Sequence, residues 1–165
     1  MKKILFAAFL MLAPLSLMAQ KFGHFNSSEV VSAMPEYTTA QNELQNLAKQ
    51  YEDELKRMQD EFQKKNEEYQ KQQAQLLDNI KQLREQELQE LYQRIQQSVQ
   101  DNQQAFQKAQ AEKMQAITEK VLAAVKKIGE AGGYVYIMDT TMGIPYISTT
   151  LSTDITPELK KSLGI

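Results

Sequence analysis

One short sequence in this chain has residue types that could do chemistry: Asp139-Thr140-Thr141, directly after an apolar run. Aspartic proteases use such an Asp-Thr pair, but they also need a second carboxylate that shares a proton and a glycine directly after the threonine. Here the next glycine is Gly143. A short motif without its structural context is weak, and an Asp side chain readily caps a turn through its own backbone. We therefore predict that Asp139 caps a turn and that the chain is not an enzyme.

Histidine and cysteine, which hold most transition metals in proteins, are almost absent. The chain has one histidine, His24, and no cysteine, so we predict no zinc, no haem and no other cofactor. An unperturbed histidine titrates near neutral pH, but a single histidine in a strand is more often packed and hydrogen-bonded, and we expect this of His24. Without disulfides, packing or oligomerisation must stabilise the fold.

The first twenty residues have the composition of an export signal. Two lysines precede an apolar run that ends at Met18, and Ala19 is a small residue at which a signal peptidase could cut. The run is shorter than the roughly 20 residues that span a bilayer, and Pro14 interrupts it, which disfavours a membrane anchor. We predict that residues 1–20 are removed by cleavage near Ala19 and Gln20.

The charge of the mature chain argues against a nucleic-acid partner. Removal of residues 1–20 takes two of the 19 basic residues and none of the 21 acidic ones, which leaves a formal charge of −4. A general nucleic-acid binder carries a basic face that displaces counterions from phosphates. We predict no binding to nucleic acid.

A long helical region from Glu36 to Ile128 contains neither glycine nor proline and is rich in Gln, Glu, Lys, Leu and Ala. Apolar residues recur at heptad spacing along it, which predicts a coiled-coil stripe. A single rod would be roughly 140 Å long, whereas a hairpin would be about half that. Only a hairpin brings together the strand-like segments at the two ends of the region. We predict an antiparallel hairpin with its turn between Asp78 and Arg84, where the heptad spacing breaks.

The two ends of the mature chain are predicted to form one small body, residues 21–35 with residues 129–165. We expect strands at 22–26, 134–138 and 144–150, the last two pairing with each other around a turn, with Pro145 on an edge because it has no N–H to donate. Glycines at 129, 132 and 133 are expected to stop the returning helix. Asn26 or Ser27 is expected to cap a short helix, and Thr156 another. Three short strands form a small core, so we expect association through them. The predicted fold class is α+β.

Several segments in a fixed order resemble the Skp (OmpH-like) family of periplasmic chaperones. They are MPEY at 34–37, AQNELQ at 40–45, GYVYIMD at 133–139 and DITPELKKSLG at 154–164, with the helical region between them. No single motif is highly specific, but their order and spacing together are. The resemblance covers the whole mature chain.

The resemblance implies a homotrimer in the periplasm, in which strands of three subunits form a central body and three helical arms enclose a cavity. Such proteins hold unfolded outer-membrane β-barrel proteins without ATP and prevent their aggregation. Flexible arms of mixed polarity suit this task, because many weak contacts can hold a client and still release it. The best-known family members are strongly basic, whereas this mature chain is acidic. We therefore predict no lipopolysaccharide site, and peripheral contact with membrane lipids stays an open alternative.

Two sets of residues are candidates for these roles. The candidates for client contact are the apolar residues nearest the predicted turn: Met58, Phe62, Tyr69, Leu76, Leu77, Ile80, Leu83, Leu88 and Tyr92. The candidates for oligomerisation are the apolar residues of the predicted strands: Phe22, Phe25, Tyr134, Val135, Tyr136, Ile137, Ile144, Tyr146 and Ile147. Helix-on-helix packing is an equally good interpretation of the first set.

A structural spacer or adaptor of the cell envelope is the alternative function. Adaptors of this kind usually carry large β-domains beside the hairpin. Only about fifty mature residues lie outside the predicted hairpin here, which is small for such domains.

Overall fold

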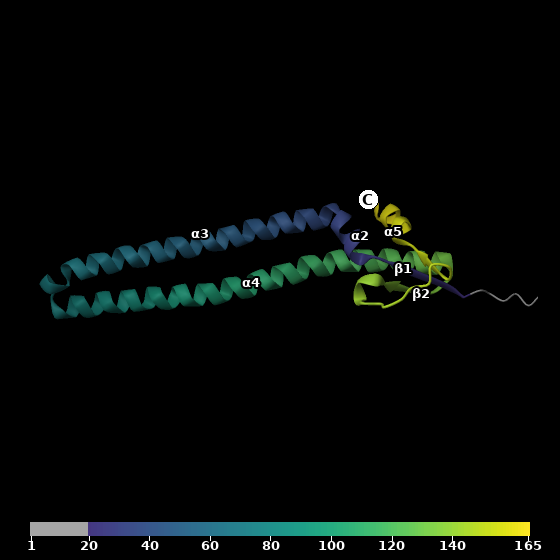
Figure 1. Ribbon diagram of the computed structural model, residues 1–165. Helices are drawn as coiled ribbons and strands as arrows, with labels where there is room; N and C mark the ends of the chain where they lie inside the picture. Colours follow the sequence, from purple (N-terminus) through teal and green to yellow (C-terminus); the bar gives the residue numbers. More distant parts are fainter. Residues whose placement is uncertain (1–19) are drawn as a thin grey trace, which may run out of the picture.

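The computed structural model describes residues 20–165, and Figure 1 shows two long helices lying side by side with a small sheet and short helices at one end. The predicted signal peptide lies outside the described residues except for Gln20. Among the described residues, no helix is both long enough and apolar enough to span a membrane.

The two long helices, α3 (Pro35–Gln72) and α4 (Asp78–Gly132), form the arm. Pro35 occupies the first turn of α3, where its missing N–H has no partner to lose. A short 3₁₀ helix, η2 (Gln73–Gln75), and two extended leucines then connect α3 to α4. The turn therefore lies before Asp78, and its predicted place between Asp78 and Arg84 is wrong. Asp78 begins α4 because an acidic side chain favours the positive end of a helix.

The arm is packed firmly at two places and loosely between them. Leu91 and Ile95 are buried near the tip, and Ile117 and Val121 near the root. Between Ile95 and Ile117 no residue of α4 is fully buried, because the inward positions include Ser98 and Asn102. The Asn102 amide nitrogen is shielded from solvent without a hydrogen-bond partner in the described chain, which weakens this part of the arm further.

Glycine decides where α4 ends. The helix continues through Gly129 and Gly132 and ends at Gly133, whose φ of 65° is left-handed. The expectation that Gly129 helps to stop the helix is wrong. A Cβ at Gly129 would lie 3.3 Å from the Ile137 side chain, so its glycine allows the helix to approach the sheet closely.

The sheet consists of three parallel strands in the order β2-β1-β3. They are β1 (Lys21–Phe25), β2 (Tyr134–Asp139) and β3 (Ser152–Asp154). The predicted strand at 144–150 is absent and does not pair with β2, so the predicted antiparallel pair is wrong. Instead the long arm serves as the crossover between the parallel strands β1 and β2.

Local hydrogen bonds explain why residues 144–150 do not form a strand. After β2 the chain enters a 3₁₀ turn, η3 (Thr140–Met142), and Gly143 has a left-handed φ of 77°. Farther along, the Ser148 hydroxyl accepts hydrogen bonds from the backbone N–H groups of Thr150 and Leu151. Such side-chain bonds compete with a strand ladder, and Pro145 has no N–H to offer one.

Two short helices, α2 (Ser27–Ala33) and α5 (Thr156–Leu163), complete the body. Asn26 caps α2 by accepting a hydrogen bond from the Glu29 N–H at 3.0 Å. Thr156 does not cap α5 as predicted: its hydroxyl accepts from the Asn26 N–H, while the Asp154 carboxylate accepts from the Thr156 N–H at 2.9 Å. These bonds join the starts of the two helices.

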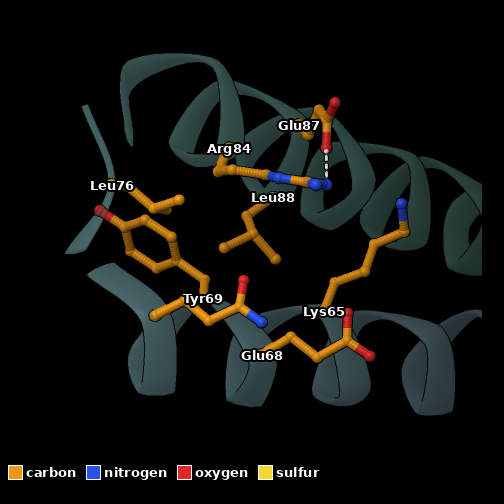
Figure 2. A pocket seen from close by; sticks show the side chains of 8 residues that line it. Lys65, Glu68, Tyr69, Leu76, Arg84, Glu87 and Leu88 are labelled. Carbon is orange, nitrogen blue, oxygen red and sulfur yellow. Dashed lines mark hydrogen bonds and ion pairs between the residues drawn. The ribbon is translucent and has the colours of Figure 1, made fainter. Parts of the chain in front are cut away.

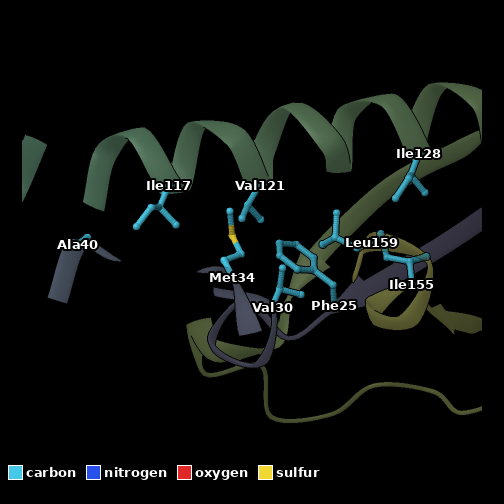
Figure 3. Packing of buried hydrophobic residues seen from close by; sticks show 9 residues of the cluster. All are labelled: Phe25, Val30, Met34, Ala40, Ile117, Val121, Ile128, Ile155 and Leu159. Atoms are coloured by element: carbon cyan, nitrogen blue, oxygen red, sulfur yellow. The ribbon is translucent and has the colours of Figure 1, made fainter. Parts of the chain in front are cut away.

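The hydrophobic core lies where α2, α5, the sheet and the root of the arm meet (Figure 3). Val30, Met34, Ile155 and Leu159 are its largest fully buried side chains.

 
Their exposed fractions are 0% for Val30, Ile155 and Leu159 and 1% for Met34. The core thus fixes the sheet and both short helices against α4, and the arm extends from it as a separate projection.

Candidate functional site: the arm and the open face of the sheet

The client-contact candidates occupy both helices and the turn at the far end of the arm. Three of the nine are well exposed in this chain: Leu77 at 73%, and Leu83 and Tyr92 at 51% each. The other six are half-buried along the contact between α3 and α4. The Phe62 and Tyr92 rings lie across this contact, with 6.0 Å between their centroids. The structure therefore places most of the set in helix packing and leaves three side chains open to solvent.

A small hollow lies between the helices just inside the turn (Figure 2). Its volume is about 30 Å³, which has room for about one water molecule. Tyr69 and Leu88 face it from the two helices, and Leu76 closes it at the turn. The Tyr69 hydroxyl donates a hydrogen bond to Glu85, and this bond raises the pKa of Tyr69 above its ordinary value. The hollow is too small for a client side chain.

Ion pairs join the two helices at the root of the arm. Lys120 pairs with Glu36, and Lys113 pairs with Glu43, about two helical turns farther from the body. The hydrogen bond from Lys120 lowers the pKa of Glu36. All four side chains are substantially exposed, so each pair adds little stability.

The sheet has one packed face and one open face. Tyr136 and Met138 on β2 lie beside Phe22 and His24 on β1, in parallel register. The Phe22 and Tyr136 rings are 4.8 Å apart between centroids. The segment after β2 passes over this face and leaves a hollow of about 220 Å³, which Tyr146 and other apolar side chains line. This open face is apolar and only partly covered by the described chain.

The oligomerisation candidates divide between the two faces. Phe25 is 4% exposed and lies in the core, and Tyr134 and Ile137 pack against that core. Phe22, Ile144 and Ile147 are half-buried on the open face. The remaining three candidates are exposed: Val135 at 56%, Tyr136 at 49% and Tyr146 at 79%. Phe25 is thus a core residue and is not available for contact with another subunit.

Sequence reasoning missed three exposed apolar residues of the body, Met138, Met142 and Leu151. Their exposed fractions are 45%, 82% and 73%. Met138 could have been found, because it alternates with Tyr136 along the strand. Met142 and Leu151 lie outside any strand and follow no pattern that marks them.

The polar groups of the body serve packing and capping. His24 Nδ1 lies 2.8 Å from the Ser152 hydroxyl, as expected for a packed histidine. Asp139 accepts from the N–H groups of Ser27 at 3.2 Å and Thr141 at 3.0 Å, so its predicted role as a turn cap is correct. Burial raises the pKa of Asp139, but hydrogen bonds from Ser27 and Thr141 outweigh it and hold that pKa below its ordinary value. Within residues 20–165, no group of three or more His, Cys, Asp or Glu side chains is arranged to hold a metal ion.

Together these features define a class of protein: a small body of three parallel strands and two short helices, with one open apolar face and a long two-helix arm. The profile of the OmpH-like outer membrane protein family matches residues 21–163, so the chain belongs to this family. The crystal structure of a proposed outer membrane chaperone (OmpH-like) from Caulobacter crescentus CB15 is similar, with a TM-score of 0.75 and 12% sequence identity. The match covers 87% of this chain and 83% of that chain, and at this identity it shows a shared fold. Among curated proteins, none matches this sequence.

Proposed function

We propose that this protein is an ATP-independent holdase that binds unfolded outer-membrane β-barrel proteins in the periplasm and prevents their aggregation. The observation that carries the proposal is the combination of a long, poorly packed arm with a small body whose apolar face is open. Membership of the OmpH-like family supports it, as does the likeness to a proposed outer membrane chaperone. Residues 1–20 act as the cleaved export signal in this proposal.

The body, residues 21–35 with residues 129–165, assembles into a homotrimer. Both edge strands, β2 and β3, have one side without a strand partner in the described chain, and such edges favour pairing with another chain. Exposed apolar residues lie beside them, including Tyr136 and Tyr146. Pairing of the β2 edge of one copy with the β3 edge of the next is a head-to-tail contact, which can close into a ring. Three arms would then project from one body.

The arm, residues 36–128, forms the wall of the client cavity. Leu77, Leu83 and Tyr92 are our first candidates for client contact, because their side chains are open to solvent. Their separation along the arm favours several weak contacts over one deep pocket, which suits release without nucleotide hydrolysis. The weakly packed middle of the arm allows it to bend around clients of different sizes.

The test uses the mature chain and an unfolded outer-membrane β-barrel protein diluted out of urea. We expect light scattering by the client to fall as the chain is added, to a minimum near one trimer per client. Solution mass and small-angle scattering on the chain alone should give three copies and an extended shape. Client aggregation that proceeds at every dose would refute the holdase, and a monomer would refute the assembly.

A further inference from the structure

One side of the arm carries rows of glutamine at seven-residue spacing. The first row on α4 consists of Gln82, Gln89, Gln96, Gln103 and Gln110. A second row, four residues farther along, consists of Gln86, Gln93, Gln100 and Gln107. Residues four and seven apart lie on the same face of a helix. The two rows therefore form one continuous surface, which we call the glutamine strip, and all nine side chains are exposed.

The groove at the root of the arm shows which side the strip is on. Met114 follows Gln110 by four residues and so continues the strip toward the body. Met114, Thr118 and Leu122 line a groove together with Tyr37 of α3. At the root of the arm, the strip thus ends on the same side as Tyr37.

The ion pairs lie on the opposite side. At the root, Lys113 lines a separate groove with Glu36 and Glu43. At the root of the arm, these charges and the end of the strip therefore lie in separate grooves.

The glutamine strip has few partners within the chain. Gln86 donates a hydrogen bond to Glu90 at 3.1 Å, and the other eight side chains make no hydrogen bond to another residue of the described chain. Tyr92 and Val99 border the strip and are 51% and 46% exposed. Two carboxylates, Glu85 and Glu90, border the strip near the tip, and they accept hydrogen bonds from Tyr69 and Gln86. The strip offers amides and two apolar side chains to a partner.

The spacing of the amides fits an extended polypeptide. A glutamine side chain ends in an amide whose C=O accepts and whose NH₂ group donates, so it can pair with both the N–H and the C=O of a peptide group. Seven residues of helix advance about 10.5 Å, and three residues of extended chain advance about 10 Å. An extended chain lying along the strip would therefore bring a peptide group near each successive glutamine of a row.

We propose that the glutamine strip binds the main chain of an unfolded, extended polypeptide through side-chain amide hydrogen bonds. This inference rests on the proposed holdase function and assigns the client-facing side of the arm. Because the strip is uncharged, binding depends little on the net charge of the client or on salt. The apolar side chains of Tyr92 and Val99 add contacts that are independent of sequence.

The experiment compares two triple variants of the full mature chain. The strip variant carries Gln89→Ala, Gln96→Ala and Gln103→Ala. The matched control carries Gln45→Ala, Gln50→Ala and Gln59→Ala, three exposed glutamines on the other long helix, α3. Alanine has the higher helix propensity, so circular dichroism should show undiminished helix in both variants.

Two probes distinguish binding to the main chain of a client from binding to its side chains. The first is an unfolded outer-membrane β-barrel protein. The second is a blocked, uncharged Ser/Val peptide of about twelve residues, about 40 Å long when extended, which is close to the length of the strip. A version of the peptide with alternate backbone amides N-methylated keeps its side chains but loses half of its main-chain donors.

We expect the strip variant to bind both probes at least about ten-fold more weakly, since each lost hydrogen bond weakens binding several-fold. The affinity of the control variant should stay within about two-fold of that of the unchanged chain. The affinity of the unchanged chain should likewise change by no more than about two-fold between about 0.05 M and about 0.5 M NaCl. The N-methylated peptide should bind the unchanged chain about as weakly as the plain peptide binds the strip variant.

Three results would overturn the inference while leaving the holdase intact: equal effects of the two variants, full binding of the N-methylated peptide, or binding that falls steeply with salt. A change in solution mass confined to the strip variant would also overturn it, because the strip would then pack against a second copy. Failure of the unchanged chain to bind the unfolded barrel protein would instead refute the proposed function itself.

Discussion

Replacement of Leu159 by alanine should destabilise the body far more than replacement of an exposed leucine at the tip of the arm. Leu159 is 0% exposed and packs in the core where α5 meets α4 and the sheet (Figure 3). The substitution removes three buried carbons, worth about 2.4 kcal/mol at about 0.8 kcal/mol for each. The cavity left behind adds to this loss, and measured Leu→Ala changes in cores reach about 3 to 5 kcal/mol. We expect a loss of about 3 kcal/mol.

The assay is urea unfolding at one fixed chain concentration, because assembly would make the apparent stability depend on concentration. Circular dichroism follows the helices, and the fluorescence of the seven tyrosines, which include Tyr37 and Tyr134 beside the core, follows the tertiary structure. Leu77→Ala is the control, since Leu77 is 73% exposed, and it should change stability by no more than about 0.5 kcal/mol. Equal losses for the two variants would show that the body does not depend on this core.

Two further substitutions test particular contacts. Asp139→Asn should lower the free energy of unfolding by about 1 kcal/mol at neutral pH. The folded pKa of Asp139 lies below its ordinary 3.8. The contribution of the carboxylate to stability is therefore complete above 3.8, and it disappears as the pH falls through the folded pKa. Urea unfolding at a series of pH values should therefore show a difference from the unchanged chain that is full at neutral pH and shrinks as the pH falls below about 3.8. A difference that stays constant from neutral pH into acid would contradict the assignment. Gly133→Ala should lose about 1 kcal/mol through its left-handed φ of 65° alone, since no atom lies within 4 Å of the added Cβ. Gly133→Asn should lose less, and thermal unfolding in which alanine is as stable as glycine would contradict the reasoning.

The sequence was sufficient to predict the parts of the fold that depend on local preference. A long region without glycine or proline predicted the long helices, and Asn26 and Pro35 marked two of the helix starts, as the structure has them. The place of the turn was not predictable in this way. Gln73 to Gln75 have good helix propensity, and no breaker marks the change of direction, so only the packing of α3 against α4 decides it.

The sheet could not be predicted because its strands depend on distant partners. Ser152–Asp154 is short and polar, yet it forms β3 by pairing with β1. The more apolar residues that precede it fail to form a strand because local hydrogen bonds and Pro145 compete with a ladder. A prediction from hydrophobicity alone therefore selects residues 144–150, which form no strand, and misses β3.

The same limit applies to the candidate site. Phe22 and Phe25 look alike in sequence, but alternation along β1 places them on opposite faces, and only the packing of α4 and α5 decides that the Phe25 face is buried. On the arm, heptad spacing correctly marked the contact between the helices, but it treated every apolar residue as equivalent. Exposure separates Leu77, Leu83 and Tyr92 from the rest.

The charged root of the arm and the glutamine strip suit different kinds of partner. At the root, lysine and glutamate pair with each other across the helices, so an incoming charge must compete with pairs already formed. On the side of the glutamine strip, most donors and acceptors have no partner within the described chain, and replacing water with peptide groups there leaves no buried charge. A protein that must hold many different clients gains from a surface whose groups complement what all clients share, the main chain. Under the proposed function, the strip would let a chain with a formal charge of −2 bind clients without a basic surface.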